Sequence, residues 1–197
     1  MNRCCLITCL ALFLFSCTAE EKKVSAPGSS RISSVTLKSL DGKTSSVGEL
    51  LKNNRVNIFY FLIPDCPVCE FYSLDINKLS EKYSGQGVSS FAVFPVPDYS
   101  DEEIISYRDS FHVRIPFYRD LKFSFTNVLG ATVAPEVFVL DSAGTVLYSG
   151  SIDDLAYATG KKRMEATVFF LNDALENIVS GKPVAVKSTT AYGCLIE

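Results

Sequence analysis

Residues 56–70 read VNIFYFLIPDCPVCE, and this stretch decides the fold of the 197-residue chain. Its first part, from Val56 to Ile63, is almost entirely β-branched or aromatic, which is typical of a central strand buried on both faces. Pro64 and Asp65 end that run. The C-P-V-C that follows begins a helix, because apolar residues then recur at spacings of three and four as far as Tyr83. The stretch therefore predicts a central strand that leads directly into a helix.

The rest of the chain continues this alternation. Further strands are expected near residues 33–39, 88–94, 115–118, 137–140 and 145–149. Further helices are expected at residues 46–52, 100–110, 121–129 and 164–178. Two of these helices open with a capping box, Ser46 with Glu49 and Ser100 with Glu103. Alternating strands and helices predict an α/β fold, a sheet with helices on both faces.

Composition narrows the classes of function. Hydrophobic residues make up 47% of the chain and charged residues 21%, so there is enough apolar surface for one sizeable core. The 19 Lys and Arg and the 22 Asp and Glu give a net charge of −3 without a basic block. Because nucleic-acid binding normally needs a basic stripe, no nucleic-acid partner is expected. His112 is the one histidine in the sequence, which excludes sites that need two, including most zinc hydrolase sites.

The N-terminus has the pattern of a bacterial lipoprotein signal. Arg3 precedes an apolar run of roughly ten residues, which suits a secretory signal and is too short for a helix to span a membrane. The run ends in Leu-Phe-Ser-Cys17, which resembles the lipobox whose cysteine is diacylated. Residues 1–16 are thus expected to be a signal peptide and Cys17 a lipidation site. An ordinary signal peptide followed by a coincidental cysteine is the alternative.

These features divide the chain into four parts. After the signal, residues 17–31 are polar and aperiodic and are expected to form a flexible linker. Residues 32–183 form the folded domain, and residues 184–197 form a C-terminal tail. The acyl chains would hold the protein on a membrane of the bacterial cell envelope, with the domain facing the periplasm or extracytoplasmic space.

The chemistry is expected at Cys66 and Cys69. Two residues three apart in the first turn of a helix lie side by side, within reach of a disulfide. The helix N-terminus stabilises a thiolate, and Pro67 is well suited to that first turn. The sequence therefore predicts an exposed, nucleophilic Cys66 and a second thiol, Cys69, that resolves the mixed disulfide.

Two other uses of the C-x-x-C pair are less favoured. A structural zinc site needs a second pair of ligands, and the sequence has neither a second C-x-x-C nor a histidine pair. A purely structural disulfide more usually links distant segments, since closing a loop of four residues stabilises little. Redox chemistry is the preferred interpretation.

C-P-V-C after a strand, followed by V-A-P-E-V-F-V-L-D at residues 133–141, resembles the thioredoxin-like superfamily. The closer resemblance is to its redoxin and membrane-anchored thiol–disulfide oxidoreductase branch. It implies a thioredoxin-like fold with a central mixed sheet, an N-terminal strand extension and a C-terminal helix. It also implies a cis Pro135 facing the cysteines, and a backbone at Ala134 that pairs with a substrate strand. Partners would be protein thiol or disulfide substrates and a redox partner protein, with no cofactor.

The sequence departs from the family pattern at two positions. Tyr60 stands where thioredoxins carry a buried acidic residue that assists proton transfer at the second cysteine. Asp65 stands where they carry a tryptophan, and its charge opposes thiolate formation at Cys66. Asp65 and Glu70 are expected to be solvated.

A peroxiredoxin-like thiol peroxidase is the nearest alternative. The peroxiredoxin motif has a proline seven positions, and a Thr or Ser three positions, before the reactive cysteine. In this sequence those positions hold Phe59 and Ile63. Arg119 is a candidate for stabilising the reactive thiolate, although a solvated pair with Asp120 is expected.

Cys194 has no assigned role, and three options stay open. It is a third redox thiol that resolves Cys66, a third soft ligand for a metal, or a packed bystander. The metal option defines a Cu(I)-handling lipoprotein with His112 as a fourth ligand. Against that option, His112 is expected to lie at the end of the helix at residues 100–110.

Overall fold

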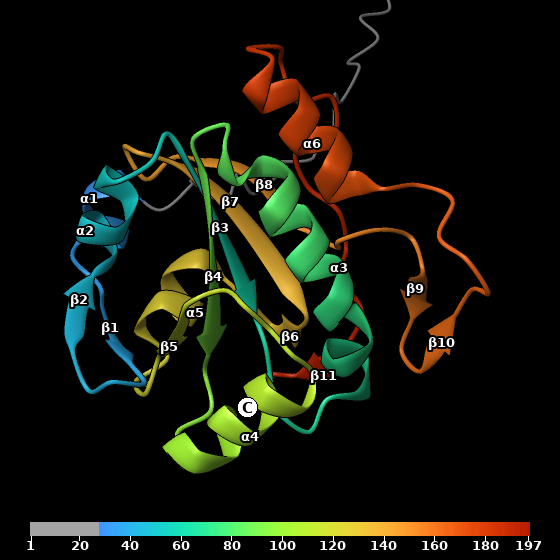
Figure 1. The fold of residues 1–197 in the computed structure, drawn as a ribbon. Coiled ribbons are helices and arrows are strands. Elements are labelled where there is room, and N and C mark those ends of the chain that lie inside the picture. Colours follow the sequence, from blue (N-terminus) through green and yellow to red (C-terminus); the bar gives the residue numbers. More distant parts are fainter. Residues whose placement is uncertain (1–27) are drawn as a thin grey trace, which may run out of the picture.

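A computed structural model describes residues 28–197 of the chain (Figure 1). The predicted signal peptide, Cys17 and most of the predicted linker lie outside the described residues. The first helix, α1 (Ser29–Ser33), already contributes the buried Ile32 to the core. Within the described residues, Ser29, Ser30 and Arg31 are therefore helical, although they belong to the segment predicted as flexible linker.

A seven-stranded mixed sheet forms the centre of the fold. Its strands, in spatial order, are β2 (Thr44–Ser46), β1 (Thr36–Ser39), β5 (Phe117–Arg119), β4 (Val88–Phe94), β3 (Val56–Phe61), β7 (Glu136–Asp141) and β8 (Val146–Gly150). The central strand β3 runs parallel to β4 and antiparallel to β7, so the predicted mixed sheet is confirmed. All six residues of β3 are buried, as the continuous apolar run predicts.

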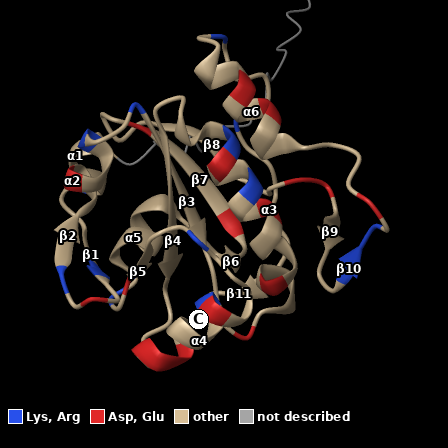
Figure 2. Ribbon diagram, viewed as in Figure 1, with Lys and Arg blue, Asp and Glu red and all other residues tan. Residues whose placement is uncertain are grey.

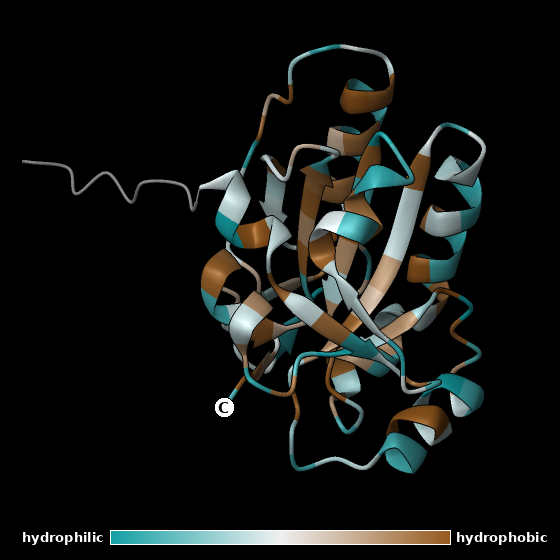
Figure 3. Ribbon diagram, turned by 90° about the vertical axis from the view of Figure 1, so that its left-hand side faces the viewer, coloured by the Kyte–Doolittle hydropathy of each residue, from teal (hydrophilic) through white to brown (hydrophobic). Residues whose placement is uncertain are grey.

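Helices cover both faces of this sheet, and side chains that alternate along β3 divide between them (Figure 1). Tyr60 packs in a cluster with side chains of α3 (Pro67–Ser84), α4 (Asp101–Ser110) and α6 (Phe170–Val179). Phe59 and Phe61 pack in a second cluster with α1, α2 (Val47–Lys52) and α5 (Ser124–Leu129). In Figure 3 the most apolar residues lie in the central strands and alternate with polar residues along the helices. The prediction of a sheet between helical layers is confirmed.

Local signals placed several elements correctly. Both predicted capping boxes are formed, at the start of α2 by Ser46 and Glu49 and at the start of α4 by Ser100 and Glu103. Helix α3 ends before Gly85, as predicted. Among residues 28–197, no helix combines the length and the apolar character needed to cross a membrane.

The C-terminal helix is shorter than predicted. It begins at Phe170 instead of Met164, whose side chain is 99% exposed. The carboxylate of Asp154 accepts hydrogen bonds from the backbone N–H groups of Thr167 and Val168, which fixes that segment outside the helix. The preceding residues form a small hairpin, β9 (Ala156–Ala158) and β10 (Lys161–Lys162), which the sequence analysis missed.

Charges of both signs are interspersed over the ribbon in the view of Figure 2. The densest acidic group is the first turn of α4, with Asp101, Glu102 and Glu103. These carboxylates lie at the positive end of the helix dipole, where negative charge is stabilising.

Candidate active site at the start of helix α3

The predicted cysteines lie at the junction of strand and helix. Cys66 is the N-cap residue of α3 with extended backbone angles, and Pro67 is the first helical residue. The backbone N–H of Glu70 donates to the carbonyl of Cys66 over 3.0 Å and closes the first turn. Cys66 thus occupies the positive end of an 18-residue helix, as the sequence predicted.

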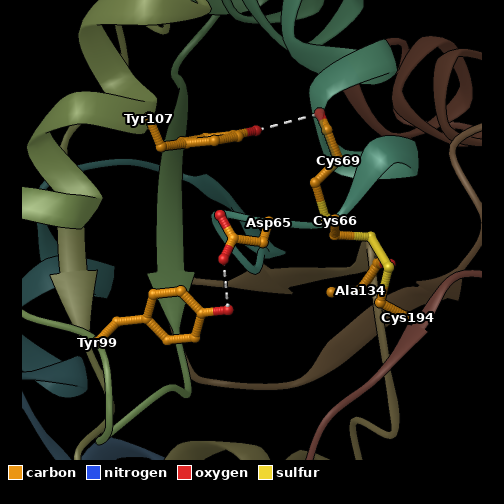
Figure 4. The surroundings of a disulfide bond; sticks show 7 residues. All are labelled: Asp65, Cys66, Cys69, Tyr99, Tyr107, Ala134 and Cys194. Carbon is orange, nitrogen blue, oxygen red and sulfur yellow. Dashed lines mark hydrogen bonds between the residues drawn. A yellow bond between two sulfur atoms is a disulfide. The ribbon is translucent and has the colours of Figure 1, made fainter.

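Cys66 is bonded to Cys194, and not to Cys69 (Figure 4). The two bonded residues are 128 positions apart in sequence, with their Cα atoms 6.0 Å apart. Cys69 is a free thiol and is completely buried. The prediction that Cys66 is exposed is wrong, because the C-terminal tail covers it and leaves it 0% exposed. A Cys66–Cys69 redox pair stays a prediction.

The loop before β7 lies against Cys66. The Ala134–Pro135 peptide bond is cis, as the family resemblance implied. The Sγ atom of Cys66 lies 3.3 Å from the carbonyl oxygen of Ala134, whose residue is fully buried. The predicted substrate-binding residues and the predicted nucleophile are therefore adjacent.

The protein's own tail occupies the backbone edge at Ala134. A short strand, β11 (Cys194–Leu195), pairs antiparallel with β6 (Val133–Ala134), with Cys194 opposite Ala134. The N–H of Ile196 donates to the carbonyl of Thr132 over 3.0 Å and extends this pairing. The edge expected to bind a substrate strand thus holds a cysteine-containing strand of the same chain.

Cys69 is held in a buried, hydrogen-bonded surrounding. Its carbonyl oxygen accepts from the hydroxyl of Tyr107 over 3.1 Å (Figure 4) and from the hydroxyl of Ser73 over the same distance. Burial raises the pKa of the Cys69 thiol to about 12, the charge of Glu70 adds to the rise, and a backbone hydrogen bond at Ile63 opposes it. Cys69 is therefore a protonated thiol at neutral pH.

Tyr60 and Asp65, the two positions that depart from the family pattern, do not supply a carboxylate beside Cys69. Tyr60 is fully buried, and burial raises the pKa of its phenol well above the ordinary value. Asp65 is exposed, as predicted, and accepts a hydrogen bond of 3.1 Å from the hydroxyl of Tyr99 (Figure 4). Its carboxylate is next in sequence to Cys66, while Glu70 is half-buried.

The expected solvated pair of Arg119 with Asp120 is not formed, because Arg119 is buried. Its side chain is 8% exposed, and its guanidinium pairs with Asp101 and donates to the carbonyls of Val96, Pro97 and Tyr99. Its expected partner Asp120 is also buried, and accepts from three backbone N–H groups at the start of α5. The guanidinium thus fixes the loop after β4, which is a structural use and not support for a peroxidase site.

The described residues give the copper alternative no support. His112 is exposed, at the end of α4 as expected, and its carbonyl accepts from the side chain of Asn77. Cys66 and Cys194, two of the three thiolates that alternative requires, are joined in the disulfide. No group of three His, Cys, Asp or Glu within residues 28–197 is arranged to hold a metal ion.

A largely apolar cavity of about 390 Å³ adjoins the disulfide. It lies between the start of α3, with Val68 and Phe71, and the β9–β10 hairpin, and Gly193 and Cys194 form part of its wall. Lys162 also lines it, with its ammonium 5.0 Å from the ring centre of the half-exposed Phe71. The site therefore combines a sulfur centre, a backbone edge and an apolar hollow.

The comparison with protein families agrees with this geometry. The Redoxin family matches residues 26–162, which include the C-P-V-C motif and the cis-proline loop. The chain belongs to the Redoxin family. This confirms the prediction of a thioredoxin-like redoxin and, at that coarse level, of a thiol oxidoreductase. No curated protein matches this redoxin.

Solved structures confirm the thioredoxin-like fold. A hypothetical protein from Sinorhizobium meliloti is 23% identical with a TM-score of 0.72, over 84% of this redoxin and 91% of that chain. An uncharacterised conserved protein from Geobacillus kaustophilus is 21% identical with the same score, over 84% and 89%. A secreted Mycobacterium tuberculosis disulfide oxidoreductase, described as homologous to Escherichia coli DsbE, is 14% identical with a TM-score of 0.53, over 77% and 98%. At these identities the likeness concerns the fold.

Proposed function

We propose that this redoxin is a lipid-anchored, extracytoplasmic thiol–disulfide oxidoreductase that exchanges disulfides with partner proteins. Cys66 is the nucleophile, Cys69 resolves the mixed disulfide, and Ala134 and Pro135 shape the edge that binds the substrate. One observation carries the proposal: the Cys66 sulfur lies at a helix N-terminus and 3.3 Å from the carbonyl of Ala134, beside a backbone edge that accepts a strand.

The exchange follows from this placement. The Cys66 thiolate attacks one sulfur of a substrate disulfide, so that a Cys66–substrate bond forms and the other substrate sulfur leaves and takes up a proton. Cys69 then loses its proton and attacks Cys66, which forms Cys66–Cys69 and releases the second substrate thiol. The substrate gains two electrons and the redoxin loses two, which a dithiol of a redox partner protein restores. The same steps in reverse oxidise a substrate dithiol.

Several features support the rest of the proposal. The substrate strand would add to β6 at Val133 and Ala134 by main-chain hydrogen bonds. The apolar cavity beside Phe71 would receive a side chain next to the substrate cysteine. The signal-like N-terminus, with Cys17 at its end, supports anchoring outside the cytoplasm, and one structural neighbour is described as secreted.

Reduction of insulin disulfides by the purified protein, with dithiothreitol as the electron source, tests the chemistry. We expect turnover by the wild type and loss of turnover in Cys66→Ser. In Cys69→Ser/Cys194→Ser, which lacks both thiols that can attack Cys66, we expect mixed disulfides with insulin instead of turnover. Equal rates in the three proteins would end the oxidoreductase proposal. Hydrogen peroxide turnover that survives Cys69→Ser would favour the peroxidase.

Metabolic labelling with palmitate tests the anchor. Incorporation into the wild type and its loss in Cys17→Ala is the expected result. An unlabelled wild-type protein would remove the lipid anchor and leave the redox proposal intact, since the site lies entirely within residues 66–194.

A further inference from the structure

We propose that the last six residues, 192–197, act as an internal substrate. Cys194 is a third redox thiol that forms a disulfide with Cys66 in the oxidised protein. The segment then occupies the substrate-binding edge of β6 until a donor reduces the Cys66–Cys194 disulfide. We call these residues the arm. The inference rests on the proposed function and names what occupies its site between turnovers.

The arm makes the contacts expected of a bound protein substrate. It adds as an antiparallel strand to β6, which is how an extended substrate would bind. Its cysteine faces Ala134 and is bonded to the predicted nucleophile Cys66. The Cys66–Cys194 bond therefore has the arrangement of a mixed disulfide between enzyme and substrate, formed within one chain.

The fit of the arm is specific. A Cβ atom added to Gly193 would lie 2.0 Å from the carbonyl oxygen of Ala134 and 3.1 Å from the nitrogen of Pro135. Both are backbone atoms next to the cis bond, so they cannot rotate away as a side chain would. A residue with a side chain cannot occupy position 193 in this pairing, and the glycine before Cys194 is a requirement of the closed state.

The chain before the arm is fastened separately, along the edge of β8. The N–H of Thr189 donates to the carbonyl of Ser149 over 3.0 Å, and the N–H of Ser149 donates to the carbonyl of Lys187 over 3.0 Å. Gly150 admits this strand, because a Cβ there would lie 2.2 Å from the carbonyl oxygen of Thr189. Residues 187–190 therefore form an anchor that holds the base of the arm near Cys66.

Apart from its disulfide, the arm is held by a two-residue pairing with β6 and by the partly buried side chains of Cys194 and Ile196. None of its six residues is fully buried, and Leu195 is 66% exposed. Segments with few buried contacts and exposed hydrogen bonds open at low cost in free energy. The short tether from the anchor keeps the arm at an effective concentration on the order of millimolar or higher. The arm can therefore leave Cys66 when reduced and still compete strongly for it.

The closing step is an internal exchange that needs no other reagent. After turnover, the Cys194 thiolate attacks Cys66 in the Cys66–Cys69 disulfide. The Cys66–Cys194 bond forms, the Cys66–Cys69 bond breaks, and Cys69 takes up a proton, so no net oxidation occurs. Since burial raises the pKa of the Cys69 thiol to about 12, Cys69 keeps that proton at neutral pH. The protein then stays oxidised through the Cys66–Cys194 disulfide, in which Cys66 cannot act as a nucleophile.

Disulfide mapping of the air-oxidised protein tests the inference. Peptide mass analysis after acid quenching should find Cys66–Cys194 as the main disulfide of the wild type, with Cys69 alkylated only after denaturation. Cys194→Ser should move the disulfide to Cys66–Cys69. A wild type that carries mainly Cys66–Cys69, or no disulfide at Cys194, overturns the inference.

Gly193→Ala tests the geometry with all three cysteines kept. We expect its Cys66–Cys194 fraction to fall at least tenfold, whereas the matched control Leu195→Ala, which changes an exposed side chain in the same arm, should map like the wild type. An undiminished Cys66–Cys194 fraction in Gly193→Ala would overturn the proposed pairing.

Trapping separates failure of the inference from failure of the proposed function. A cysteine-containing peptide disulfide at about 50 μM should trap roughly tenfold more mixed disulfide on Cys69→Ser/Cys194→Ser than on Cys69→Ser, because the tethered arm competes at millimolar effective concentration. Equal, substantial trapping on both proteins would overturn the inference alone. Absence of trapping on the double variant would refute the proposed function.

Discussion

Replacing Arg119 with methionine tests whether this buried cation supports the structure of the loop after β4. In the wild type its guanidinium pairs with Asp101 and donates to three carbonyls of that loop. Arg119→Met keeps most of the side-chain volume and removes every one of these bonds. Loss of one partner of a buried ion pair costs about 3–5 kcal/mol. The Asp101 side chain keeps 29% exposure and a bond to Lys38, so we expect the low end, about 3 kcal/mol.

Lys38→Met is the matched control, because Lys38 binds the other oxygen of the same carboxylate from a half-exposed position. An exposed pair of this kind contributes about 0.5–1 kcal/mol. Urea unfolding of the reduced proteins measures both losses. With a slope of about 2 kcal/mol/M, Arg119→Met should lower the midpoint by roughly 1.5 M and Lys38→Met by less than about 0.5 M. A loss in Arg119→Met no larger than in Lys38→Met would refute the reasoning.

The pH dependence provides a second check with a fixed sign. The hydrogen bond from Arg119 lowers the pKa of Asp101 in the folded protein, and the bond from Lys38 adds to this. A carboxyl with a lowered folded pKa stabilises fully above its unfolded pKa of about 3.9, and that contribution is lost as the pH falls further. The difference between wild type and Arg119→Met should therefore be largest near pH 7 and shrink below about pH 4.

Three further predictions concern the site and its surroundings. Because burial raises the pKa of Cys69 to about 12, its alkylation in Cys66→Ser/Cys194→Ser should rise about tenfold per pH unit from pH 7 to above pH 10; a plateau near pH 9 would contradict this burial. Asp65→Asn removes an exposed charge next to Cys66 and should speed iodoacetamide alkylation of reduced Cys66 about twofold at pH 7 and low salt; an unchanged or slower rate would count against it. Asp154→Ala removes the acceptor that fixes Thr167 and Val168, so limited trypsin digestion should cleave faster at Arg163, with Asp173→Ala as the unaffected control.

Much of the fold follows from local sequence signals. The apolar run at residues 56–63 and the capping boxes at Ser46 and Ser100 each report on their own segment, and the structure confirms them. The apolar periodicity predicts too long a C-terminal helix, because Met164 and Val168 also fall on that periodicity. The helix begins only at Phe170 because the carboxylate of Asp154 binds the backbone of the preceding segment, a contact that periodicity cannot reveal.

The site was predictable in part, for a similar reason. Cys66, Cys69 and Pro135 belong to motifs with fixed spacing, so their proximity could be expected from the family resemblance. The pairing of the arm with β6 could not, because two-residue strands carry no alternation to detect. The one local signal is Gly193, whose lack of a side chain is explained only by the close approach of Ala134.

The span of the Cys66–Cys194 bond has a consequence for how long each form of the protein survives. By the chain-entropy model, a cross-link across 128 residues stabilises the native state by about 5 kcal/mol, whereas closing the four-residue loop between Cys66 and Cys69 contributes about 2 kcal/mol. Moving one covalent bond from Cys69 to Cys194 thus makes global unfolding rarer by roughly two orders of magnitude. Proteases that attack unfolded chains would therefore remove reduced copies before disulfide-bonded ones, so the abundance of this redoxin would fall as the supply of electrons rises.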